Sequence, residues 1–174
     1  MGLYLGLDSS TQSLSAMIID TTLGRVVLDE SVSFGKALPQ YRSPSGFLAH
    51  DDPRIKHADP LMWVEALDLL LGQLKGRGVD FSLVEGISGA GQQHGSVYLN
   101  QKLSNVAPWD SSQDLVGQVR PLLSRATSPI WMDSSTSQQC SEIAAALGGD
   151  ARNPLGQLLP GVTADRKERA DRSR

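Results

Sequence analysis

The first residues with the types and spacing for chemistry form the polar segment Asp8-Ser9-Ser10-Thr11-Gln12-Ser13, between two apolar runs. A carboxylate at a strand end is a hard oxygen ligand for Mg²⁺, and hydroxyls with backbone N–H groups can donate to phosphate oxygens. Asp8, Ser10 and Thr11 are therefore a candidate Mg²⁺ and phosphate site. The same residue types also make ordinary polar hairpin turns, and this alternative stays open.

A second candidate is the glycine-flanked segment Gly89-Ala90-Gly91-Gln92-Gln93-His94-Gly95. It differs from the dinucleotide-binding fingerprint, because the third glycine falls one place late and the next residues favour a strand over a helix. Two amides and an imidazole could instead bind the hydroxyl and carbonyl groups of a polar ligand. A turn whose side chains satisfy its own backbone is the alternative.

A third acidic residue, Asp133, follows the short apolar run Ile130-Trp131-Met132. It could contact a ligand or a metal, and it could equally cap the next helix. His50 and His57 lie in a segment without metal-ligand spacing, so we expect both to be exposed to solvent. Cys140 falls on a predicted apolar helix stripe, where a thiol is more often inert packing than a nucleophile.

Three predicted strands position the first candidate site. They cover residues 3–8, 14–20 and 25–34, and the short connections between them favour antiparallel neighbours. Residues 35–59 are rich in proline and glycine and lack periodicity, which predicts a long loop.

The clearest predicted helix begins at Asp59-Pro60, where Asp59 can accept from free backbone N–H groups and proline suits the first helical position. We expect its apolar stripe to be Trp63, Leu67, Leu70 and Leu74, with Gly76 and Gly78 ending the helix. The other predicted elements are strands over 83–88, 95–100 and 130–132, helical turns within 111–125, and a helix over 135–147.

Composition limits the class of protein. The 174 residues favour one domain with its own core, and a net charge of −3 gives no basic field for nucleic acid. A single cysteine excludes a disulfide scaffold and suits a reducing compartment. No run is long and apolar enough for a spanning helix, so we expect a soluble, cytoplasmic protein. Residues 153–174 are polar and irregular, and we expect them to be a disordered tail.

The segments LYLGLDSSTQSLSAMIID, LMWVEALDLLL, ISGAGQQHGSVYLN and SPIWMDSSTSQQC together resemble the N-terminal part of the FGGY carbohydrate kinases, most closely their eukaryotic D-xylulose-phosphorylating branch. The resemblance covers about residues 3–152, and we expect a partial domain over residues 1–152. It implies a ribonuclease H-like (actin-like ATPase) α/β fold with a mixed sheet, consistent with the antiparallel start predicted above.

By this resemblance, Asp8 organises Mg²⁺ and the ATP phosphates, with Ser10 and Thr11 in the phosphate-facing loop. His94 and Gln93 correspond to sugar-contacting positions, and Asp133 to the acid of the family's second N-terminal signature. The implied reaction is transfer of the ATP γ-phosphoryl group to D-xylulose, giving D-xylulose 5-phosphate.

The family's catalytic base has no counterpart in this sequence, so the resemblance implies a truncated kinase with no catalytic residue of its own and little or no activity alone. We expect uncovered surface to favour self-association. The alternatives are a residual sugar-binding module, another sugar kinase of the family, and, less consistent with the acidic balance, a ribonuclease H-like nuclease using Asp8.

Overall fold

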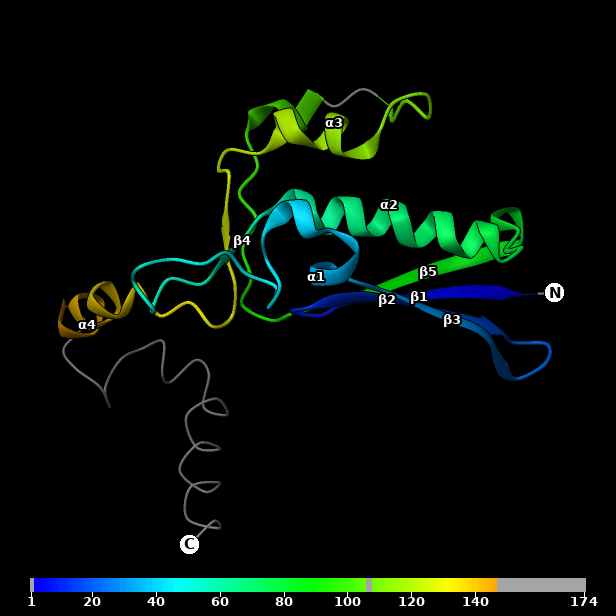
Figure 1. The fold of residues 1–174 in the computed structure, drawn as a ribbon, viewed down its shortest axis with the longest axis horizontal. Helices are drawn as coiled ribbons and strands as arrows, with labels where there is room; N and C mark the ends of the chain where they lie inside the picture. The colour runs from blue at the N-terminus through cyan, green and yellow to red at the C-terminus, as the bar shows by residue number, and fades with distance from the viewer. Residues whose placement is uncertain (1, 106–107, 147–174) are drawn as a thin grey trace, which may run out of the picture. The chain divides into compact units, whose positions relative to one another are not determined.

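A mixed four-stranded sheet forms the centre of the computed structural model, which describes residues 2–105 and 108–146. The strands lie in the order β3-β2-β1-β5 (Figure 1). The bounds are β1 Leu3–Ser9, β2 Ser13–Asp20, β3 Arg25–Ser33 and β5 Val84–Gly91. The first three strands are antiparallel neighbours, as predicted, and β5 runs parallel to β1.

Strand β2 shows why the sheet has one buried face. Its Leu14, Ala16 and Ile18 are buried, whereas Met17 and Ile19, which alternate with them, are exposed. Because successive side chains of a strand point to opposite faces, this alternation directs one face to the core and leaves the other open.

Helix α2, Pro60–Gly76, covers the buried face and lies between the sheet and α3, Leu115–Val119 (Figure 1). Its start is as predicted, since Asp59 Oδ1 accepts from Leu61 N at 2.8 Å and Pro60 is the first helical residue. The buried stripe differs in part from the prediction. It follows Met62, Ala66, Leu70 and Leu74, and Trp63 and Leu67 are only partly buried at its side.

The predicted loop over residues 35–59 is largely irregular, with two short helical turns, α1 Phe34–Ala37 and η1 Pro39–Tyr41. The segment ends in β4, His57–Ala58, which pairs antiparallel with β6, Ser128–Pro129. This two-stranded pairing brings the loop against the residues just before Asp133.

Two predicted strands are wrong. Residues 95–100 form only an isolated bridge between Leu99 and Leu123, and Trp131 and Met132 lie in a turn after β6. Between α2 and α3 the chain also makes the 3₁₀ turns η2 Phe81–Leu83 and η3 Gln101–Asn105. After α3, Pro121 enters the 3₁₀ turn η4 Arg120–Leu122, which explains the interruption expected there.

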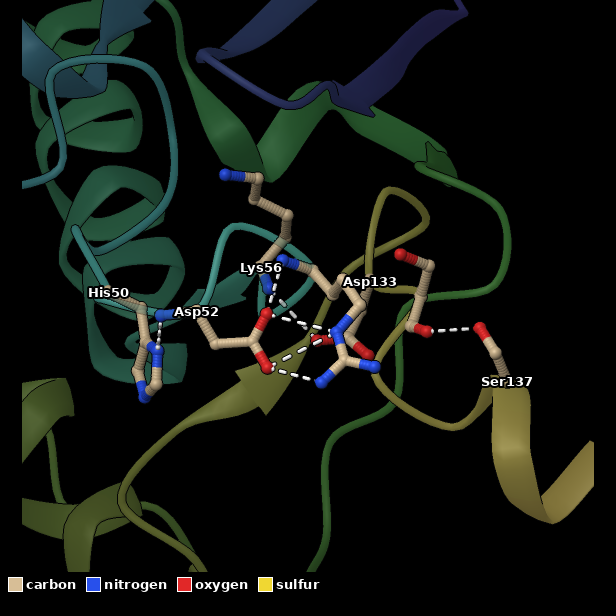
Figure 2. Close-up of polar contacts among 7 residues, drawn as sticks. His50, Asp52, Lys56, Asp133 and Ser137 are labelled. Atoms are coloured by element: carbon tan, nitrogen blue, oxygen red, sulfur yellow. Dashed lines mark hydrogen bonds and ion pairs between the residues drawn. The ribbon is translucent and has the colours of Figure 1, made fainter.

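The chain divides into two compact units, Met1–Asp133 and Ser134–Arg174. In the second unit, α4 spans Ser137–Ala146, and the Ser137 hydroxyl donates to the Ser134 carbonyl near its start (Figure 2). The expected burial of Cys140 is wrong, because its side chain is exposed, as is that of Ile143 three residues further along α4.

Leu147 and the predicted tail 153–174 lie outside the described residues, so the tail and the boundary at residue 152 stay predictions. None of the described helices combines the length and apolar character that a membrane span requires.

Candidate functional site

The carboxyl ends of β1 and β5 bring two predicted site segments together. The strands are parallel neighbours, with Asp8 beside Ala90 and Ser9 beside Gly91. The ladder continues one step further, where Gln92 N donates to Ser9 O at 2.9 Å. The Asp8–Thr11 loop and the Gln92–His94 turn therefore leave the sheet at the same edge.

A cavity of about 350 Å³ opens between these loops. Polar groups from both loops and one indole line it: Asp8, Ser10, Thr11, Gly91, Gln92, Gln93, His94 and Trp131. The structure thus gathers five predicted site residues, Asp8, Ser10, Thr11, Gln93 and His94, around one space. This volume is within the range of small-molecule sites.

The Asp8 loop is a tight turn that carries a carboxylate beside hydroxyls. Ser10 N donates to Ser13 O at 2.9 Å, and the Ser10 hydroxyl donates to Asp8 Oδ2, also at 2.9 Å. The hairpin-turn geometry and the candidate site are therefore present in the same residues. The exposed Asp8 carboxylate keeps acceptor capacity toward the cavity.

This donor set fits Mg²⁺ bound with phosphate. No cluster of three or more His, Cys, Asp or Glu side chains with metal-binding geometry occurs among residues 2–105 and 108–146. Mg²⁺ does not need one, since it is usually held by one or two carboxylates and completes its octahedron with water and phosphate oxygens. Asp8 can supply the protein ligand, and the Thr11 hydroxyl can donate to the phosphates. The Ser10 hydroxyl can do so only in exchange for its hydrogen bond to Asp8.

The second loop is held in an unusual backbone conformation. His94 has φ +61°, one of two non-glycine residues with positive φ in the described part of the chain. A side chain with this φ costs about 1–2 kcal/mol, and such residues cluster at functional sites. Nearby, Gln92 Oε1 is buried without a hydrogen-bond partner among the described residues, so it is an acceptor that a ligand hydroxyl could satisfy.

Trp131 is a site residue that the sequence did not indicate. Its side chain lines the cavity while 54% exposed, and its Nε1–H donates to Thr11 Oγ1 at 3.0 Å. The two residues are 120 positions apart, and no local pattern signals such a contact.

Asp133 lies next to the site and does not line the cavity. Its side chain is 6% exposed, and Oδ2 accepts from Lys56 N at 2.9 Å and lies 3.4 Å from His57 Nε2 (Figure 2 shows the Lys56 contact). The expected exposure of His57 is wrong. Its side chain is 20% exposed, and Nδ1 lies 2.9 Å from Thr127 Oγ1. A direct ligand contact by Asp133 stays a prediction.

His50 is exposed, as expected, and its Nδ1 accepts from Asp52 N at 2.9 Å (Figure 2). Asp52 also binds Arg54, whose side chain and backbone hydrogen bonds lower the pKa of Asp52 to about 2. This turn shapes the loop before Lys56 and contributes no residue to the cavity.

A larger hollow of about 720 Å³ lies on the open face of the sheet and also reaches Asp8. Residues of all four strands line it: Gly6, Leu7, Asp8, Ser15, Ala16, Met17, Asp29, Glu30, Ser31, Ser88, Gly89 and Ala90. Asp8 thus stands between the loop cavity and the open sheet face, where an extended ligand could contact both.

Comparison with known sequences gives consistent relatives. Xylulose kinase 2 of Arabidopsis thaliana is 45% identical over 149 residues, which are 84% of this chain and 26% of the relative. Xylulose kinase of Mus musculus is 43% identical over 149 residues, covering 83% of this chain and 26% of the relative. The chain therefore spans about a quarter of the length of these relatives. No protein-family model matches it.

Solved structures agree on the fold. A xyloylose kinase from Brucella ovis matches 83% of this chain and 24% of its own with a TM-score of 0.59 at 21% identity. Xylulose kinase from Rhodospirillum rubrum matches 84% and 24% with a TM-score of 0.58 at 19% identity. These likenesses confirm the predicted ribonuclease H-like, actin-like ATPase α/β fold.

Proposed function

We propose that this chain, which is homologous over most of its residues to the xylulose kinases of the FGGY carbohydrate kinase family, forms part of a site for phosphoryl transfer from ATP to D-xylulose. In this proposal the chain supplies the walls that face the phosphates and the sugar.

The single observation that carries the proposal is the cavity at the ends of β1 and β5. A carboxylate and hydroxyls on one side, from Asp8, Ser10 and Thr11, face amide and imidazole groups on the other, from Gln93 and His94. Phosphoryl transfer depends mainly on positioning and electrostatic stabilisation, so a kinase must bring phosphate-binding and acceptor-binding groups into one space.

On the phosphate side, Asp8 would hold Mg²⁺ and the Thr11 hydroxyl would donate to phosphate oxygens. Ser10 would donate to a phosphate by exchanging its hydrogen bond to Asp8 for one to the ligand. The bound Mg²⁺ would neutralise charge on the phosphates. The Ser10 hydroxyl, which donates to Asp8 Oδ2, fixes the rotamer of this carboxylate before any ion arrives.

On the sugar side, Gln93 can both donate and accept, and His94 presents two ring nitrogens. A ketopentose offers hydroxyls that donate and accept and a carbonyl that accepts, which these groups match. The His94 backbone conformation supports the assignment, because strain of this kind persists where the surrounding structure requires it.

A base that would receive the proton of the sugar hydroxyl is the remaining requirement. Asp8 is the one carboxylate among the lining residues of the cavity, and it is assigned to Mg²⁺. We therefore propose that this chain binds the sugar weakly and shows little or no turnover by itself. The single cysteine supports a reducing, cytoplasmic compartment for the site.

A titration with two ligands tests the binding part. Backbone NMR spectra of the ¹⁵N-labelled chain are followed with D-xylulose and, separately, with Mg·ADP. We expect saturable shifts at Gln93 and His94 for the sugar, lost in His94→Ala, and at Ser10 and Thr11 for Mg·ADP, lost in Asp8→Asn. His50→Ala is the matched control, because His50 is an exposed histidine outside the cavity. Absence of any saturable shift at tens of millimolar sugar would contradict the sugar site.

An ADP-release assay tests turnover. We expect no release above background with Mg·ATP and D-xylulose. Release that requires both Mg²⁺ and D-xylulose, and that Asp8→Ala abolishes, would overturn the proposed inactivity and support the kinase assignment directly. Metal-dependent cleavage of an RNA–DNA hybrid would instead favour a nuclease.

A further inference from the structure

We infer that Trp131 is a positioning residue that orients the Thr11 hydroxyl toward the phosphate side of the cavity, and that Asp133 and His57 hold Trp131 in place. The inference deepens the proposed function and rests on it. It also gives Asp133 a role at the site without direct contact to the ligand.

The backbone of Lys56 is hydrogen-bonded to both ends of the turn that carries Trp131. Ile130 N donates to Lys56 O at 3.0 Å, and Lys56 N donates to Asp133 Oδ2 at 2.9 Å. Asp133 N in turn donates to Ile130 O at 2.9 Å. These three hydrogen bonds form a ring that brackets Trp131, so the backbone around the indole has little freedom.

This ring of three hydrogen bonds is anchored in the protein interior. Ile130 is 2% exposed within the core, and the adjoining strands β4 and β6 pair antiparallel. The buried Asp133 carboxylate faces His57 Nε2, and the opposite ring nitrogen of His57 lies against Thr127 Oγ1. A buried carboxylate needs such partners, because an unpaired one would carry a large desolvation cost.

The chemistry at Thr11 follows from the indole. Trp Nε1–H is a donor only, so Thr11 Oγ1 must be the acceptor in their 3.0 Å contact. The Thr11 hydroxyl proton is then free to donate elsewhere, and Thr11 lines the cavity beside Asp8. A phosphate oxygen is an acceptor only, so the indole leaves Thr11 in the orientation that such a ligand requires.

The first test replaces the donor. Trp131→Phe keeps an aromatic ring and removes the N–H, and Trp109→Phe is the matched control at another exposed tryptophan. We expect Trp131→Phe to shift the Thr11 amide resonance and to weaken Mg·ADP binding about fivefold, the loss of one hydrogen bond of about 1 kcal/mol. D-xylulose shifts at Gln93 should persist. An unchanged Thr11 resonance in Trp131→Phe would overturn the inference.

The second test addresses the ring of hydrogen bonds. Solvent exchange of the Trp131 indole N–H is measured in wild type, Asp133→Ala, Asp133→Asn and His57→Leu. We expect exchange at least tenfold faster in Asp133→Ala, and largely restored protection in Asp133→Asn, whose side-chain oxygen can still accept from Lys56 N. His57→Leu should give an intermediate rate. Should Asp133→Ala fail to fold, His57→Leu decides, and wild-type exchange there would overturn the role of the ring.

These readouts separate the two proposals. If wild type binds neither Mg·ADP nor D-xylulose, the proposed function fails, and the Thr11 resonance and indole exchange still decide the structural part. If both ligands bind and Trp131→Phe leaves Mg·ADP affinity unchanged, the positioning role fails and the proposed function stands.

Discussion

Single residues hold the Asp8–Thr11 loop by close contact as well as by hydrogen bonds. Gly46, from the irregular segment after β3, has φ +85° and lies against the backbone of Thr11, so that a Cβ there would overlap the Thr11 carbonyl oxygen. Gly35 is similarly tight, since a Cβ would lie 2.9 Å from Pro44 Cα. The proline-rich loop can therefore approach the backbone of Thr11 because residue 46 is a glycine, and Gly35 permits a similar close contact within the loop at Pro44.

Gly46→Ala should destabilise the protein strongly. Positive φ alone costs an alanine about 1–2 kcal/mol, and the overlap with Thr11 adds to it. Gly78→Ala is the matched control, because Gly78 has φ +88° and open space around its Cβ position. We expect the unfolding free energy measured in urea to fall further for Gly46→Ala than for Gly78→Ala. Equal losses would contradict a packing role for Gly46.

His94→Gly should separate stability from ligand binding. Glycine relieves the positive-φ strain of about 1–2 kcal/mol and loses about 0.5–1 kcal/mol to backbone entropy, so we expect a small net stabilisation. The same change removes the imidazole and should abolish the D-xylulose shifts. Urea unfolding and the sugar titration check the two effects, and a clear loss of stability would show that the backbone conformation is not strained.

At the scale of elements, the helical turn η1 joins the irregular segment to α2. The Tyr41 hydroxyl donates to Glu65 Oε2 at 2.6 Å, and Gln40 Nε2 donates to Glu65 Oε1 at 2.8 Å. Desolvation by burial, and then the hydrogen bond to Glu65, raise the pKa of Tyr41 above its ordinary value of 10. Glu65 thus fixes the loop that carries Gly46 to the side of the helix.

Tyr41→Phe should lower the unfolding free energy by about 1 kcal/mol, the net value of one hydrogen bond. Because the pKa of Tyr41 is raised on folding, its contribution is complete below pH 10 and is lost as the pH rises above 10. Urea unfolding of wild type and Tyr41→Phe at pH 7 measures the loss of stability. Alkaline titration of both proteins, followed by the absorbance of ionised tyrosine, measures the pKa. If the tyrosine that is missing from the titration of Tyr41→Phe is one that ionises near pH 10, the raised pKa of Tyr41 would be contradicted.

The sequence predicts the secondary-structure elements whose pattern lies within their own residues or their immediate connections. Strands β1 to β3 and the start of α2 follow from alternation, from short connections and from the Asp59-Pro60 pair. Strand β5 continues to Gly91 through a glycine-rich stretch because β1 pairs with it, which is a tertiary effect. Residues 131–132 form a turn because the backbone N–H of Ile130 donates to Lys56 O and the carbonyl of Ile130 accepts from Asp133 N.

The sequence predicts the polar residues of the candidate site but not the residues that pack beside them. Asp8, Ser10, Thr11, Gln93 and His94 carry recognisable chemistry in short segments, and parallel pairing of β1 with β5 unites them. Trp131 and His57 carried no such signal, because their partners lie 120 and 76 or 70 residues away and depend on how the loops pack. Local patterns therefore give the polar groups of the candidate site, and the folded arrangement of the whole chain gives the groups that pack beside them.

At the scale of the whole molecule, β5 is an edge of the described sheet. Over Val84–Gly91 it carries one charged residue, Glu85, and its Ile87 is 68% exposed. An edge with few charges and an exposed apolar residue is a template for pairing with another chain. The uncovered edge is the basis for the self-association that we predict.

Ile87→Lys should reduce this association. A lysine at the edge carries a charge that is costly to bury against a second strand. Sedimentation velocity over a concentration series should show larger species in wild type and fewer in Ile87→Lys. Leu23→Lys, at an exposed apolar residue in the β2–β3 turn, is the control and should behave as wild type. A monomeric wild type at high concentration would contradict the prediction.

The contact between Trp131 and Thr11 has a consequence for the order of folding. It closes a loop of 120 residues, whereas β1, β2 and β3 pair between near neighbours in sequence. Loop closure grows more costly in entropy with length, and long-range contacts reward it only after the intervening chain is ordered. The three antiparallel strands β1 to β3 can thus pair early in folding, whereas the cavity, which needs the long-range contacts of β5 and Trp131, is completed late.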